Sequence, residues 1–254
     1  MKYEKLHAFN LVMGGLHAVQ GAVILIIGQT APRVINIEYF VFNPNTETLM
    51  STTRTLFKVD IPLLVALFFF LSATAHLYVA TLGRQRYEAG LKEHMNRYRW
   101  YEYSLSASLM IVLIAMLAGI FNFVALFGLF SLTAVMNLMG LMMEVHNHRA
   151  KKVNWLSYNI GALAGIIPWI AIGVALWASE SSGSGQAVPT FVYAIFVSLF
   201  VFFSAFAVNM VLQYKKIGKW SDYLYGERAY IILSLLAKSA LAWQIYAGIL
   251  QPVG

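Results

Sequence analysis

Long apolar runs separated by short polar segments are the dominant pattern along this chain. Seven of these runs are long enough to cross a bilayer as helices, which takes about 20 residues for a ~30 Å hydrocarbon core. They lie near residues 7–29, 59–82, 96–120, 123–145, 155–178, 189–213 and 227–250. No internal repeat divides them. The pattern therefore predicts an all-α membrane protein, a single domain over residues 1–254 built as a seven-transmembrane-helix bundle.

The basic residues lie almost entirely on one side of this predicted membrane. Of the 18 Lys and Arg residues, 14 lie at the N-terminus and in the even-numbered connections, and only Arg33, Arg54 and Lys58 lie on the other side. The 14 are Lys2, Lys5, Arg84, Arg86, Lys92, Arg97, Arg99, Arg149, Lys151, Lys152, Lys215, Lys216, Lys219 and Arg228. Because cytoplasmic segments carry the excess of Lys and Arg, we expect a cytoplasmic N-terminus and an extracellular C-terminus. The net charge of +7 follows this membrane pattern and gives no reason to expect nucleic acid as a partner.

The first outer connection, about 30–58, is unusually long and has a different pattern. Residues 34–42 are rich in β-branched and aromatic side chains, Asn43, Pro44 and Asn45 supply a turn, and residues 48–57 return. Two such runs joined by turn residues are typical of paired strands. We predict a small extracellular β-hairpin between the first two helices.

The composition agrees with a membrane protein, since 59% of the residues are hydrophobic and 11% are charged. The chain contains no cysteine, which excludes disulfides, thiolate metal sites and cysteine nucleophiles. Candidate chemistry must therefore come from the few ionisable side chains inside the predicted helices.

Lys238 is the most unusual of these side chains, because it lies near the middle of the last apolar run. At about 1.5 Å of rise per residue, it is roughly 15 Å from either end of its helix. A bare ammonium at that depth costs about 2.5–3.5 kcal/mol on insertion scales. Its charge must be paired, or its amine must form another bond, such as the Schiff base that a lysine makes with an aldehyde.

Glu102 is the carboxylate best placed to pair with Lys238. It lies about six residues into the third predicted helix, and the third and seventh helices run in the same direction. Helical side chains tilt toward their own N-terminus, so the lysine nitrogen reaches back toward the depth of Glu102. A purely structural ion pair is the alternative role for these two residues.

Other polar side chains lie at a similar depth. His17, His76 and Ser234 fall in the cytoplasmic half of the predicted bilayer. In the outer half of the third helix, residues 109–120 carry no ionisable side chain. We expect a polar layer that accepts a proton from the amine on the cytoplasmic side. Hydrogen bonds that only pack helices together are the alternative role for the two histidines.

Glu144, His146 and His148 have a spacing that could coordinate a metal ion. They precede a basic inner connection, however, so a solvated helix end is the favoured interpretation. We predict no metal site.

Seven helices, with a lysine in the middle of the seventh and a carboxylate on the third, resemble the retinal-binding rhodopsins of microbes. The chain departs from proton pumps such as bacteriorhodopsin. Ser234 stands where they carry a second carboxylate one turn before the lysine, and Leu113 stands where they carry the internal proton donor. With the inverted orientation and the long first outer loop, these departures resemble the heliorhodopsins. Three stretches, taken in order, carry this resemblance: Phe9-Asn10 with Leu16, His17 and Gln20; Arg99-Trp100-Tyr101-Glu102-Tyr103-Ser104; and Ser234 to Lys238 and on to Trp243.

The resemblance implies an all-trans retinal attached covalently to Lys238 as a Schiff base, with Glu102 as its counterion. It also implies a homodimer in the bilayer of the cell membrane, and a signalling or enzyme partner on the cytoplasmic side. His17 and His76 are the expected proton-accepting layer. The residues expected around the retinal, from the resemblance and from depth, are Ser234, Tyr103, Ser106, Asn137, Trp169, Phe203 and Trp243.

The favoured function is that of a light-absorbing receptor and not of an enzyme. Photoisomerisation of the retinal would drive a slow photocycle used for sensing or regulation, without ion pumping. A light-gated or light-driven ion transporter is the alternative, but a pump needs proton relays on both sides of the amine and the outer half offers none. A seven-helix membrane hydrolase that uses the histidines and a metal is a third hypothesis, and it leaves Lys238 unexplained.

Overall fold

Seven long helices confirm the predicted spans in the computed structural model, which describes residues 2–181 and 188–251. Each is long and apolar enough to cross a membrane, so the chain is a multi-pass membrane protein. The ends differ from the predicted ones by a few residues. The helices are α1 (Lys2–Ile27), α2 (Ile61–Ala80), α4 (Arg97–Leu117), α5 (Phe123–Asn147), α6 (Leu156–Ser181), α7 (Thr190–Tyr214) and α8 (Tyr223–Ile245), which a π-helical turn continues over Tyr246–Leu250.

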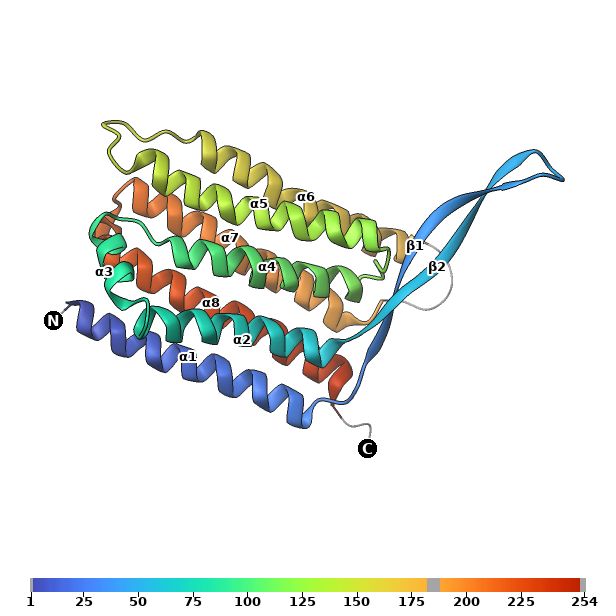
Figure 1. The fold of residues 1–254 in the computed structure, drawn as a ribbon, viewed down its shortest axis with the longest axis horizontal. Coiled ribbons are helices and arrows are strands. Elements are labelled where there is room, and N and C mark those ends of the chain that lie inside the picture. Colours follow the sequence, from blue (N-terminus) through green and yellow to red (C-terminus); the bar gives the residue numbers. More distant parts are fainter. Residues whose placement is uncertain (1, 182–187, 252–254) are drawn as a thin grey trace.

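The helices lie side by side in one bundle, with the N-terminus at one end and the strands at the other (Figure 1). We call these the α3 end, after the short helix α3 (Arg84–Lys92), and the hairpin end. Along the chain α1 packs on α2, α2 on α4, α4 on α5, α5 on α6, and α7 on α8. Helix α4 also contacts α6 and α7, and α8 contacts α1 and α2. Side chains of α2, α4 and α8 can therefore meet inside the bundle.

Polar side chains just before the helices fix where several of them begin. The Asn96 side chain accepts a hydrogen bond from the Arg99 backbone N–H at 3.1 Å at the start of α4. Asn122 and Asp222 cap the first turns of α5 and α8 in the same way. Each cap satisfies a backbone donor that the helix itself leaves unpaired, which matters most where no water is available.

The two halves of the bundle interior differ in character. The fully buried side chains toward the hairpin end are apolar, among them Ile111, Leu113, Ile195, Leu241 and Ile245. The buried polar and charged side chains gather toward the α3 end, among them Asn10, Asn96, Arg99, Glu144 and Glu227. This division places the candidate chemistry in one half of the molecule.

The predicted hairpin is confirmed as a two-stranded antiparallel sheet, β1 (Pro32–Asn43) and β2 (Thr48–Asp60). It projects beyond the helices (Figure 1). Its register runs from Pro32 opposite Asp60 to Asn43 opposite Thr48, with an irregularity between Ile35 and Asn36. The paired strands are two to three residues longer than predicted at the bundle side, because the ladder continues to Pro32 and Asp60, and α2 begins at the next residue, Ile61.

Helix α3, in the connection between the second and third predicted spans, was not predicted from the sequence. It has only nine residues and is mostly polar. Tyr87 and Leu91, one helical turn apart, are its two buried side chains and pack it against the end of the bundle. The helix therefore lies over the polar half of the interior.

Candidate functional site

Lys238 and Glu102 meet inside the bundle. The Lys238 Nζ lies 3.4 Å from Glu102 Oε1, and only 3% of the lysine side chain is exposed. Nζ also donates a hydrogen bond to Ser234 Oγ at 2.8 Å, since Ser234 lies one turn earlier on α8. Ser72 of α2, which the sequence did not single out, donates to Glu102 Oε1 at 2.6 Å. A buried charge is tolerated when it is both paired and hydrogen-bonded, as it is here.

A narrow cavity of about 40 Å³ begins at this amine and is mostly apolar. Its walls come from α4, α5, α7 and α8. The lining residues are Tyr103, Ala107, Met110, Met136, Asn137, Phe203, Phe206, Ser234, Ala237 and Lys238. A primary amine at one end of an apolar, aromatic slot has the chemistry to bind a long apolar aldehyde covalently.

The structure brings most of the predicted pocket residues to this slot. Tyr103, Asn137, Phe203 and Ser234 line it directly. Trp169 lies behind Phe203, with the two rings edge to face and 5.3 Å between their centroids. Four helices, α4, α5, α7 and α8, therefore line the cavity, and α6 supports it from behind through Trp169.

Two predicted pocket residues lie elsewhere. Trp243 is 39% exposed and donates its indole N–H to Gln20 at 3.0 Å on the bundle surface. It follows Lys238 by five residues, which turns it about 140° away around the helix. Ser106 is fully buried but does not line the cavity, and its Oγ has no hydrogen-bond partner.

The two predicted histidines lie together on the α3 side of the Lys238 amine. The rings of His17 on α1 and His76 on α2 stack with 5.4 Å between their centroids. His76 Nδ1 lies 2.7 Å from Asn10 Oδ1. Because that oxygen only accepts, Nδ1 carries the hydrogen and Nε2 is left as the basic nitrogen. Both ring nitrogens of His17 are buried without a protein partner.

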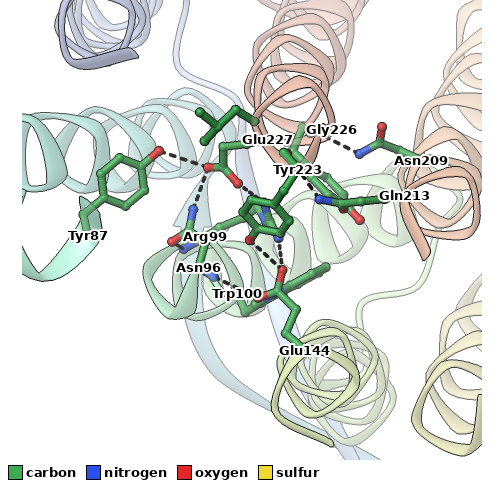
Figure 2. Close-up of polar contacts among 12 residues, drawn as sticks. Tyr87, Asn96, Arg99, Trp100, Glu144, Asn209, Gln213, Tyr223, Gly226 and Glu227 are labelled. Atoms are coloured by element: carbon green, nitrogen blue, oxygen red, sulfur yellow. Dashed lines mark hydrogen bonds and ion pairs between the residues drawn. The ribbon is translucent and has the colours of Figure 1, made fainter. Parts of the chain in front are cut away.

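A larger polar network, which the sequence analysis missed, surrounds Arg99 (Figure 2). The Arg99 guanidinium pairs with Glu144 of α5 at 2.5 Å and with Glu227 of α8, and all three side chains are buried. The Trp100 indole N–H donates to Glu144 at 2.8 Å. The guanidinium also lies 4.0 Å from the centre of the Tyr230 ring, a favourable cation–π contact. Three helices are thus held together by one buried cation and two carboxylates.

Asn96 and two tyrosines complete this network (Figure 2). Asn96 donates its backbone N–H to Glu144 at 2.9 Å and its side-chain amide to Glu227 at 2.7 Å. Tyr223 donates to Glu144 at 3.0 Å, and Tyr87 of α3 donates to Glu227 at 3.1 Å. The Tyr87 hydroxyl also receives a long contact of 3.5 Å from the Asn10 side-chain amide.

Tyr87 remains a neutral donor in this setting. Burial raises the pKa of its phenol well above the usual range, and the negative charge of Glu227 adds to the increase. The hydroxyl therefore keeps its proton at physiological pH, and it can both donate and accept.

The network corrects the interpretation of Glu144 as part of a solvated helix end. Glu144 is buried, because Arg99, Trp100 and Tyr223 supply it with donors from two other helices. Its two sequence neighbours turn elsewhere: His146 contacts Ser157 at 3.0 Å, and His148 pairs with Glu93 at 2.9 Å. Within residues 2–181 and 188–251, no group of three metal-ligating side chains forms. Arg99, counted with the basic loops, is likewise buried. Because Arg99 belongs to the stretch 99–104, which carries part of the family resemblance, this stretch was the one sequence signal that could have indicated a buried role for Arg99.

Comparison with known proteins agrees with this geometry. The family model described as Heliorhodopsin matches residues 6–250, nearly the whole chain. No curated protein matches the chain. The family implies a retinal chromophore and a receptor-type rhodopsin. With seven membrane helices and a buried lysine at the end of an apolar slot, this chain belongs to the heliorhodopsin family.

Proposed function

We propose that this heliorhodopsin is a photoreceptor in which all-trans retinal forms a Schiff base with Lys238 and Glu102 serves as the counterion. The observation that carries the proposal is the buried Lys238–Glu102 pair, 3.4 Å apart, at the mouth of an apolar slot. A structural ion pair alone gives no reason for the slot. The slot together with the amine fits a polyene aldehyde.

The residues around the slot fit this chromophore. Phe203 would lie against the polyene with Trp169 packed behind it, and Asn137 and Tyr103 would place polar atoms along the polyene. Met110 and Met136 line the cavity and are flexible enough to repack around a larger group. The retinal supplies light absorption and isomerisation, and the protein supplies the charge and the proton-accepting groups.

The protein's own residues then direct the proton on the Lys238 nitrogen. Glu102 holds it in the dark, because an opposite charge within about 4–6 Å favours the protonated amine. After isomerisation, the proton leaves toward His17 and His76, which lie together on the α3 side. In the opposite half, α4 offers only buried apolar side chains such as Leu113 and Ile114. The proton therefore returns from the side to which it left, in a slow cycle suited to sensing or regulation and not to pumping.

The surroundings of the receptor follow from the same proposal. The bias of Lys and Arg supports a cytoplasmic α3 end and an extracellular hairpin. A homodimer in the cell membrane, with a signalling or enzyme partner at the α3 end, is the arrangement that the family resemblance suggests.

Substitution of the lysine is the direct test. Lys238→Ala removes the amine, so membranes that carry the variant should form no visible absorption band when all-trans retinal is added. Trp243→Phe is the matched control, because Trp243 lies outside the slot and the band should form as in wild type. A red-shifted visible band in Lys238→Ala would show that the attachment site is wrong.

A further inference from the structure

A second, smaller cavity lies between Glu102 and the Arg99 network. Its volume is about 30 Å³, and about 10–15 Å³ is enough to hold one water molecule. Among its lining residues are Glu102, His76, Asn10, Tyr87, Arg99 and Glu227. Arg99 Nε is buried and has no hydrogen-bond partner in the protein. The cavity is therefore polar enough to hold water, and it connects the counterion with the network.

A hydrogen-bonded chain runs beside this cavity. His76 Nδ1 donates to Asn10 Oδ1 at 2.7 Å, and the Asn10 amide approaches the Tyr87 hydroxyl at 3.5 Å. Tyr87 then donates to Glu227 Oε1 at 3.1 Å. Because a hydroxyl can donate or accept, Tyr87 can reverse its role when Glu227 gains a proton.

The two carboxylates of the network are not equivalent. One guanidinium faces two of them, so the group carries one negative charge in excess when both are ionised. Glu144 accepts from four donors, three of which cannot accept in return: the Arg99 guanidinium, the Trp100 indole and the Asn96 backbone N–H. Glu227 accepts from three groups, and it lines the shared cavity, whereas Glu144 does not. A proton that enters from the side of Glu102 meets Glu227 first.

We propose that Glu227 is the residue that holds the proton which leaves the Lys238 nitrogen during the photocycle. This rests on the proposed function. The N–H bond at Lys238 breaks, the proton passes His76 and the cavity, and an O–H bond forms at the Glu227 carboxylate. Arg99 and Glu144 are left as a neutral pair, and the total charge of the site is unchanged. The return of the proton reverses both bonds.

Light-minus-dark infrared spectra of the retinal-bound protein test this assignment, because a carboxylic acid C=O stretch reports a protonated side chain directly. Wild type should show a positive C=O band that shifts in D₂O. Glu227→Gln should lose this band. Glu38→Gln, the control at an exposed carboxylate of β1, should keep it. A wild-type spectrum without the band, or a band that survives in Glu227→Gln, overturns the assignment. A band that instead shifts only in Glu102→Asp assigns the proton to the counterion.

Two further variants keep the test decisive if Glu227→Gln does not fold. Glu227→Asp should retain the band at a changed frequency, and an unchanged frequency contradicts the proposal. Tyr87→Phe should slow the rise of the band roughly 10²-fold, the lower end of what a positioned proton-transfer group contributes. Tyr101→Phe, at an exposed tyrosine of α4, should leave the rise unchanged.

The visible absorption band separates a failure of the proposed function from a failure of the Glu227 assignment. If wild type forms no visible band with retinal, both the proposed function and the Glu227 assignment are wrong. A visible band with a failed infrared test overturns the inference alone.

Discussion

A single lysine in the middle of a membrane helix is stabilised here by three side chains. Glu102 neutralises its charge, Ser234 accepts one hydrogen bond, and Ser72 holds the carboxylate from a second helix. Removing one partner of such a pair leaves a buried charge alone, which typically costs 3–5 kcal/mol. The charge at Glu102 should therefore control whether the lysine nitrogen keeps its proton.

Glu102→Gln tests this control. Without the carboxylate, the protonated form of the retinal-bound nitrogen loses its nearest opposite charge, so the proton should leave at a lower pH. We expect the visible band to disappear about 1–3 pH units below the wild-type midpoint, the range that an adjacent opposite charge produces. Spectra recorded during a pH titration measure this midpoint.

Glu38→Gln is the matched control for that titration. Glu38 is an exposed carboxylate of β1, far in the sequence from the amine, and its loss should leave the midpoint in place. A midpoint for Glu102→Gln that equals the wild-type value would exclude Glu102 as the counterion.

At the scale of the elements, the contact between α4 and α5 positions the buried network. A Cβ at Gly140 would come within 2.3 Å of the Trp100 ring, so this glycine lets the two helices approach closely. The same indole donates to Glu144, one turn further along α5. The close helix packing at Gly140 and the Arg99 network therefore both involve the Trp100 side chain.

Gly140→Ala should destabilise the protein by about 1–3 kcal/mol, because the added methyl group overpacks a buried ring. The loss should appear as faster thermal bleaching of the retinal-bound protein. Gly128→Ala, on the same helix, meets no atom within 4 Å and should be neutral or slightly stabilising. Equal bleaching rates for the two variants would show that the Trp100 ring can move to accommodate the methyl group without loss of stability.

The elements show which features the sequence could predict. The seven spans depend on apolar length, and the hairpin depends on strand residues around Asn43, Pro44 and Asn45, so both are local patterns. Depth along the helices matched Lys238 with Glu102, but only the packing of the bundle turns the two side chains toward each other, 3.4 Å apart. Helix α3 was missed because two buried residues in nine give a weak signal.

The Arg99 network shows why the remaining part of the site was not predicted. Arg99, Glu144 and Glu227 are far apart in the sequence, and each lies near the end of a predicted span, where charges usually face water or headgroups. Only the packing of α4, α5 and α8 makes them neighbours. Trp243, which was expected at the slot, lies outside its lining for the opposite reason: its distance along the chain from Lys238 is suitable, but its direction around α8 turns it toward Gln20.

At the scale of the whole molecule, the polar interior opens toward one end only. His17, His76, the small cavity and the Arg99 network all lie between the Lys238 amine and the α3 end. Toward the hairpin end, the interior consists of the apolar cluster that includes Ile111, Leu113 and Leu241. A pump needs a proton path on each side of the amine, and this arrangement supplies a path on the α3 side alone.

Illumination should therefore move no net charge across the membrane. On the hairpin side a proton would meet the buried apolar cluster around Ile111, Leu113 and Leu241, so a proton that leaves the amine toward Glu227 should return the way it came. Liposomes that carry the retinal-bound protein can be illuminated with and without a protonophore while the external pH is followed, with Lys238→Ala as the control for heating. We expect no sustained pH change in either condition.

A sustained pH change whose size or sign responds to the protonophore would show that the protein is a transporter. A steady photocurrent that follows the membrane potential would show that it is a channel. Either result would require a polar route through the apolar half, and the buried side chains of α4 near Leu113 would be the first place to look for it.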